Sequence, residues 1–137
     1  MPELVGVMTY TTTPGDWGYR WSGPGDWFEI GPEEAQPSAA NGTQLWAVRR
    51  WTSTMSGSLH LQGELTRGEN GDGVGFNIFV DGQPVYSKLI PPKGDEKIDQ
   101  NILVKTGSLI DFAVTPGPGV DNSFDSTGFK MMILSAK

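Results

Sequence analysis

The chain has 137 residues, which suits one domain with its own core and leaves too little for two, and its net charge is −6. Its ten Lys and Arg are scattered rather than gathered in a stripe, which disfavours nucleic acid and an anionic membrane surface as partners. The absence of cysteine excludes a disulfide scaffold, a zinc–thiolate site and a cysteine nucleophile, and no apolar run approaches a membrane span.

Turn-forming residues dominate the composition and indicate an all-β fold. Nineteen glycines and ten prolines favour short strands joined by tight turns, and the only helix-like start, at 32–35, is interrupted by Pro37. In chain order, strands are predicted at 5–10, 17–21, 27–30, 45–51, 58–65, 74–80, 84–90, 98–104, 109–114 and 129–134, with a loop over 31–43. We therefore expect one module over 1–137, an antiparallel β-sandwich of jelly-roll type with about eight to ten strands, with a barrel as the alternative.

The strand at 58–65 has the most regular pattern. Leu59, Leu61 and Leu65 share one parity and are predicted to face the core, while Ser58, His60, Gln62 and Glu64 face outward. The residues Val74, Phe76, Ile78 and Val80 likewise share one face, and Asp81-Gly82 then predicts a hairpin turn.

Residues that could support catalysis are sparse. His60 is the only histidine, which excludes zinc sites built on two or three histidines, and most acidic residues lie in Gly-rich turns. We therefore expect no catalytic residue and no cofactor, and keep a small hydrolase as an alternative. The stretches 69–72 and 121–127 concentrate oxygen ligands, so a structural calcium ion is also left open against turn-rich loops.

The main candidate site is an aromatic segment near the start of the chain. Five tryptophans are present, and three of them fall within residues 17–27. Flat aromatic rings cover the apolar C–H faces of sugar rings, and nearby polar side chains take the hydroxyl groups. The ligand-binding residues are therefore predicted to be Trp17, Tyr19, Arg20, Trp21, Asp26 and Trp27. Trp46 and Trp51 lie in a strand with alternating charges and are assigned instead to the core or to a sheet edge.

Several strings of the sequence resemble a known type of module. They are 47–53, 71–74, 80–82, 107–114 and 122–127, together with the aromatic element at 17–20. They look like a β-sandwich module appended to large secreted bacterial proteins that often degrade polysaccharides. The resemblance implies a non-catalytic carbohydrate-binding module that recognises β-glucans such as cellulose. It also implies that Arg49, Arg50 and Asp125 could form a buried ion pair that holds the sandwich together.

The expected function is targeting a parent glycoside hydrolase in cis to plant-type polysaccharide or oligosaccharide, outside the cell. No secretory signal follows Met1, so the segment is expected to be cut from a longer secreted protein. The alternative is a structural or protein-interaction sandwich, in which the tryptophans are core residues or contact a neighbouring domain.

Overall fold

A computed structural model describes residues 9–15, 18–22, 29–30, 34–40, 43–67, 71–117 and 127–135. All regular structure in these ranges is β. The strands are β1 (Thr9–Gly15), β2 (Gly18–Ser22), β3 (Glu29–Ile30), β4 (Glu34–Gln36), β5 (Ser38–Ala40), β6 (Thr43–Leu45), β7 (Ala47–Thr52), β8 (Gly57–Arg67), β9 (Val74–Val80), β10 (Gln83–Ile90), β11 (Asp95–Val104), β12 (Leu109–Thr115) and β13 (Thr127–Ser135). Within the described residues there is no helix with the length and hydropathy needed to cross a membrane.

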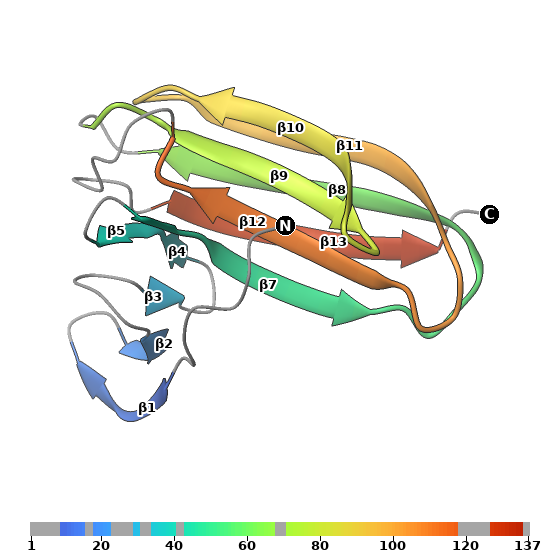
Figure 1. Cartoon of the computed structure of the whole chain (residues 1–137), viewed down its shortest axis with the longest axis horizontal. Helices are drawn as coiled ribbons and strands as arrows, with labels where there is room; N and C mark the ends of the chain where they lie inside the picture. The colour runs from blue at the N-terminus through green and yellow to red at the C-terminus, as the bar shows by residue number, and fades with distance from the viewer. Residues whose placement is uncertain are drawn as a thin grey trace.

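Two antiparallel sheets make up most of the molecule. The larger has the order β1-β2-β3-β4-β13-β8-β11, the smaller has the order β10-β9-β12-β7, and β5 pairs with β6 separately. Figure 1 shows the long strands in two stacked layers, with the short early strands gathered at one end. This arrangement confirms the predicted antiparallel β-sandwich. Nine described strands have five residues or more, in line with the predicted eight to ten, and four more have two or three.

The prediction of a continuous loop over residues 31–43 is wrong. The short strand β4 pairs with β3 and with the start of β13, and β5 forms a small hairpin with β6. Pro37 separates β4 from β5 and is buried. Pieces of three residues are too short to show alternation in the sequence, so only their sheet partners reveal them as strands.

The core lies between the two sheets, as the alternating patterns predict. Leu59, Leu61 and Leu65 of β8 are each at most 1% exposed, and their polar neighbours face outward. Phe76 and Ile78 of β9 approach them from the other layer and are fully buried. Since side chains in a strand alternate between faces, one buried face fixes the register of each strand.

The predicted hairpin at Asp81-Gly82 is confirmed. Both residues have positive φ angles, 49° and 80°, which is the conformation that a tight two-residue turn requires. The Asp81 carboxylate also accepts hydrogen bonds from the Leu109 amide at 2.8 Å and the Ser108 hydroxyl at 3.0 Å. This turn is therefore fixed to β12 as well as to its own strands.

One side of the sandwich is open in the described structure. The last strand of the smaller sheet is β7, which pairs with β12. In the larger sheet, β13 pairs with β4 only at Thr127 and Gly128, while its pairing with β8 continues to Ser135. From Phe129 onward, β13 therefore faces β7 across a gap between the two layers, and this gap holds the cleft described below.

Candidate functional site

The centre of the aromatic segment lies on a sheet strand. Tyr19, Arg20 and Trp21 belong to β2, which is hydrogen-bonded to β1 on one side and to β3 on the other. Trp21 is in register with Tyr10 of β1 and with Ile30 of β3. The backbone of this part of the predicted site is therefore fixed by two neighbouring strands.

The other three predicted ligand-binding residues, Trp17, Asp26 and Trp27, lie outside the described residues. Trp17 directly precedes β2, and Asp26 and Trp27 lie in the connection from β2 to β3. The structure thus assigns one half of the predicted set to a strand of the larger sheet.

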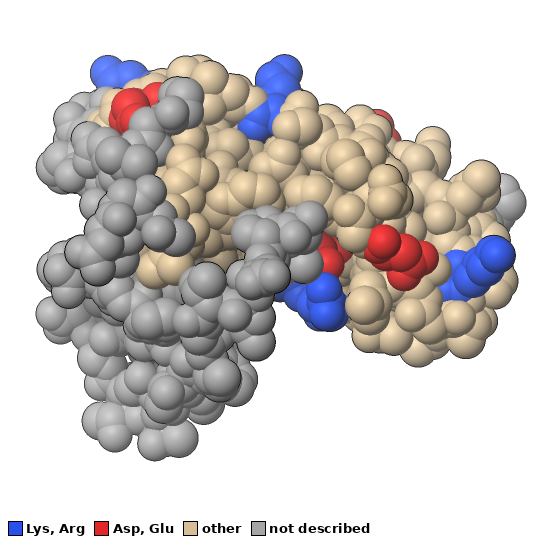
Figure 2. All heavy atoms as spheres, viewed as in Figure 1, with Lys and Arg blue, Asp and Glu red and all other residues tan. Residues whose placement is uncertain are grey.

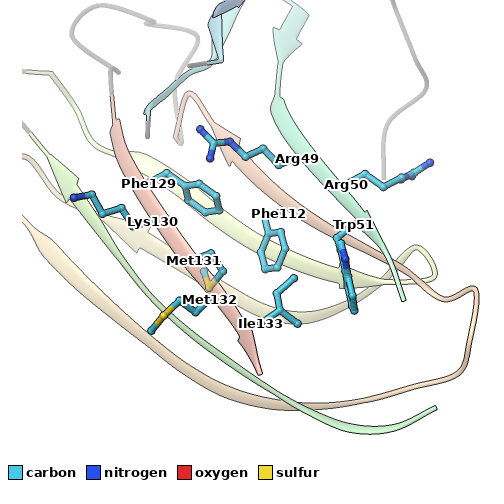
Figure 3. A pocket seen from close by; sticks show the side chains of 9 residues that line it. All are labelled: Arg49, Arg50, Trp51, Phe112, Phe129, Lys130, Met131, Met132 and Ile133. Carbon is cyan, nitrogen blue, oxygen red and sulfur yellow. The ribbon is translucent and has the colours of Figure 1, made fainter. Parts of the chain in front are cut away.

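A second candidate site is the cleft between β7 and β13, with a volume of about 420 Å³. Its described lining is Arg49, Arg50, Trp51, Phe112, Phe129, Lys130, Met131, Met132 and Ile133. In Figure 3 the side chains of Arg49, Trp51, Phe112 and Phe129 lie in the gap between the two strands, whereas Arg50 points away from it. The interior of the cleft is therefore aromatic and aliphatic, with one guanidinium group among the rings.

Arg49 lies inside the cleft because of its strand register. It pairs with Phe112 of β12, whose side chain faces the core, so the two side chains share the inner face. The Arg49 guanidinium stacks over the Phe129 ring with 4.6 Å between its central carbon and the ring centroid. Desolvation by burial lowers the pKa of Arg49 from its ordinary value.

Arg50 has a different role, because it faces the opposite side of the same sheet. Its guanidinium donates two hydrogen bonds to the Asp111 carboxylate, at 2.7 and 2.9 Å. Asp111 is fully buried, whereas the Arg50 side chain is 47% exposed. The hydrogen bond to Asp111 raises the pKa of Arg50. We call this ion pair, which links β7 to β12, the clamp.

The resemblance suggested Asp125 as the acid that pairs with these arginines, and the structure instead gives Arg50 the neighbouring-strand residue Asp111. Asp125 lies outside the described residues, so an ion pair between Arg49 and Asp125 stays a prediction.

Other titratable groups in the described ranges form only small sets. His60 lies on the outward face of β8, as predicted, and contacts the exposed Asp99 of β11. No group of three or more described His, Asp or Glu residues is arranged to hold a metal ion. On the face seen in Figure 2, the described Lys and Arg side chains stand apart from one another rather than forming a continuous stripe.

The two tryptophans assigned to the core or a sheet edge both lie at the β7 edge. Trp51 is half-buried on β7 and lines the cleft. Trp46, just before β7, is also half-buried and stacks on Phe79, with 6.2 Å between the ring centroids. Sequence reasoning did not anticipate the cleft itself. The available signal was that Arg49 shares parity with Ala47 and Trp51, which puts a cation on the core face of a strand.

Fold and sites together define an antiparallel β-sandwich with an aromatic strand in its larger sheet and an open cationic-aromatic cleft on one side. No protein-family model and no curated protein matches the sequence. Among solved structures, a ruminal GH26 endo-β-1,4-mannanase is similar at 14% identity with a TM-score of 0.49, over 98% of this chain and 27% of that chain.

Two further solved structures are similar. A family 35 carbohydrate-binding module from Clostridium thermocellum has 12% identity and a TM-score of 0.47, over 94% of this chain and 88% of that one. The ANX2 ectodomain from Arabidopsis thaliana has 13% identity and a TM-score of 0.45, over 66% of this chain and 29% of that one. This chain thus spans less than a third of the mannanase and of the ectodomain. At these identities the likeness leaves the ligand open.

Proposed function

We propose that this chain is a non-catalytic carbohydrate-binding module that attaches a parent glycoside hydrolase to plant-type polysaccharide, with β-glucan as the ligand class. The observation that carries the proposal is the position of Tyr19, Arg20 and Trp21 on β2, between two hydrogen-bonded neighbours. A strand held on both sides keeps its ring-bearing residues at fixed spacing, about 3.3 Å per residue along the chain. Tyrosine and tryptophan have few rotatable side-chain bonds, so they lose little conformational freedom when a ligand binds.

The chemistry of the segment also fits a neutral, hydroxyl-rich chain. Tyr19 and Trp21 supply rings that can cover C–H faces, and Arg20 and Asp26 supply hydrogen-bonding groups for hydroxyls. Trp17 and Trp27 add two more aromatic residues, one before and one after β2 in the sequence. The net charge of −6 suits a neutral polysaccharide better than a polyanion.

Affinity gel electrophoresis with cellulose derivatives, mixed-linkage glucan, xylan and mannan tests this proposal. Retardation by a β-glucan is expected, and it should be lost in Trp21→Ala and Trp27→Ala. Trp46→Phe is the matched control, because Trp46 stacks on Phe79 at the smaller sheet and lies outside the proposed site. Each variant is checked for folding by its thermal midpoint.

Two results would count against the proposal. If no polysaccharide retards the folded wild-type protein, and if oligosaccharides leave its tryptophan fluorescence unchanged, the structural or protein-interaction alternative is favoured. If a β-glucan retards the protein but the Trp21 and Trp27 variants behave as Trp46→Phe does, the binding residues have been assigned to the wrong surface.

A further inference from the structure

The larger sheet ends in an edge strand, β11, that is long and regular. It runs for ten residues, Asp95–Val104, and pairs with β8 on one side without any shift of register. Among the described strands, none pairs with its other side. The other sheet edges are interrupted or shorter: β1 and β10 each contain a proline and a shift of register, and β7 has six residues. A long edge without these interruptions presents backbone N–H and C=O groups that can pair with another strand.

This edge lies at the surface of the molecule. In Figure 1, β11 runs along the upper border of the sandwich, behind β10. Every second side chain of β11 is exposed, and these side chains are Asp95, Lys97, Asp99, Asn101 and Leu103. On β10, at the same border, Val85 and Leu89 are large apolar side chains that are also exposed. A partner that pairs with β11 would therefore also meet apolar surface on β10.

The geometry of sheets restricts how a second copy of this chain could pair with β11. A twofold axis perpendicular to the sheet makes the two β11 strands antiparallel and repeats every contact twice. Directly opposite residues in an antiparallel pair lie on the same face of the sheet. The exposed side chains of one copy therefore meet the exposed side chains of the other, and their charges discriminate between the possible registers.

The charges favour a register centred on Ile98. Lys97 then lies opposite Asp99 of the second copy, Asp99 lies opposite its Lys97, and residues 95–101 are paired. A centre at Lys97 or at Asp99 sets that charge opposite itself, and a centre at residue 100 leaves both charges opposite neutral residues. A centre at Glu96 pairs Asp95 with Lys97, but it sets Glu96 opposite itself and overlaps only the strand residues 95–97. Opposite charges across a strand pair stabilise it, and like charges destabilise it.

Both members of the favoured pair are accessible to a second copy. Lys97 is exposed, and within the described residues its side chain forms no hydrogen bond or ion pair. The Asp99 side chain is 74% exposed, and its contact with His60 uses only one carboxylate oxygen, Oδ1. The second oxygen, Oδ2, is left to accept a hydrogen bond from a lysine.

We propose that β11 is an interface for a second copy of this chain, in which the two edges pair antiparallel about Ile98 and reciprocal Lys97–Asp99 ion pairs fix the register. The larger sheets of the two copies then form one continuous sheet. A contact made mainly through one strand is small, so the dimer forms only at high concentration. The inference uses no residue of the predicted polysaccharide site and does not rest on the proposed function.

Sedimentation equilibrium of the full chain, from about 1 μM to about 1 mM, tests the interface. The average mass of the wild type is expected to rise with concentration from 14.8 kDa toward twice that value. Lys97→Asp and Asp99→Lys each place like charges opposite one another at both contacts, so each should weaken self-association by about tenfold or more. Lys105→Asp is the matched control, because it makes the same charge change at an exposed position beyond residues 95–101.

Two rescues test the register itself. The double variant Lys97→Asp/Asp99→Lys exchanges the two charges and should associate as the wild type does. An equimolar mixture of the two single variants should form a heterodimer, since each aspartate of one chain then faces a lysine of the other. A mass of one chain over the whole range, a wild-type dimer that either single variant leaves intact, or failure of either rescue would overturn the proposal.

Thermal midpoints check that the variants fold. Should one of them fail to fold, amide hydrogen exchange on the wild type decides: protection of the β11 amides should increase with protein concentration, and unchanged protection would contradict the interface. Retardation by a polysaccharide enters none of these outcomes, so this proposal and the proposed function can fail independently.

Discussion

The pair Arg50–Asp111 gives the sharpest test of the stability of the smaller sheet. We consider Arg50→Met, Asp111→Leu and the double variant. Arg50→Met removes two hydrogen bonds of 2.7 and 2.9 Å and leaves the Asp111 carboxylate, 0% exposed, without this cation. A hydrogen bond to a charged group contributes about 1.5–3 kcal/mol, and removing one partner of a buried pair costs about 3–5 kcal/mol.

For the loss of one partner, the lower end of the range of about 3–5 kcal/mol applies. Arg50 is nearly half exposed, so water screens its side of the pair. We therefore expect Arg50→Met to lower the free energy of unfolding by about 3 kcal/mol, or the thermal midpoint by roughly 10 °C. Asp111→Leu should be milder, because the remaining Arg50 can be hydrated. The double variant should lose less than Arg50→Met alone, since an apolar pair leaves no buried charge.

Urea unfolding followed by tryptophan fluorescence measures all four proteins, and an unchanged m-value confirms that only stability has changed. The coupling energy from the cycle is the decisive quantity. If the two single losses simply add in the double variant, or if Arg50→Met loses less than about 0.5 kcal/mol, the pair is not the clamp that the geometry indicates.

Two further predictions concern the strands on either side of the core. Gly63→Ala should lower the free energy of unfolding by about 1–3 kcal/mol in the same urea assay. The new methyl group would meet the Lys130 carbonyl oxygen and lie 2.7 Å from the Met131 sulfur. A variant as stable as the wild type would show that β13 shifts to accommodate the methyl group at little cost. Desolvation, followed by the nearby Glu96, raises the pKa of Tyr86 above its ordinary value of 10.0, so the folded state keeps the proton longer than the unfolded state. The contribution of Tyr86 to the free energy of unfolding should therefore be fully present below pH 10.0 and be lost as pH rises above it. In urea unfolding across alkaline pH, Tyr86→Phe should make this decrease less steep. If the free energy of unfolding falls equally steeply with pH in both proteins, Tyr86 is not the group responsible.

The fold class could be predicted from the sequence because the long strands carry their own pattern. The alternation around Leu61 in β8 and around Phe76 in β9 specifies both strand type and buried face, and Asp81-Gly82 specifies the turn. The short strands β4 to β6, in the region predicted as a loop, could not be predicted in the same way. β4 is a strand because β3 and the distant β13 pair with it, and β5 and β6 pair only with each other in a hairpin too short to show alternation.

The two candidate sites also differ in whether the sequence alone reveals them. The aromatic segment is visible in the sequence because Tyr19 and Trp21 lie close together in the chain, and composition alone singles them out. The cleft is not visible in this way, because its lining comes from β7, β12 and β13, which are far apart in sequence. Asp111 illustrates the same limit: nothing in its local sequence indicates that a strand 61 positions earlier supplies its arginine.

By itself, the sequence determined that this protein is an all-β sandwich with an aromatic segment near its start, because alternation, turn residues and clustering act over a few neighbouring positions. Only the tertiary structure decided that Arg50 clamps Asp111 and that Arg49 lies among the rings of a cleft between β7 and β13. The physical reason is sheet pairing. Register between distant strands determines which face each side chain shares and what it touches, and that information is distributed over the whole chain rather than held in any one segment.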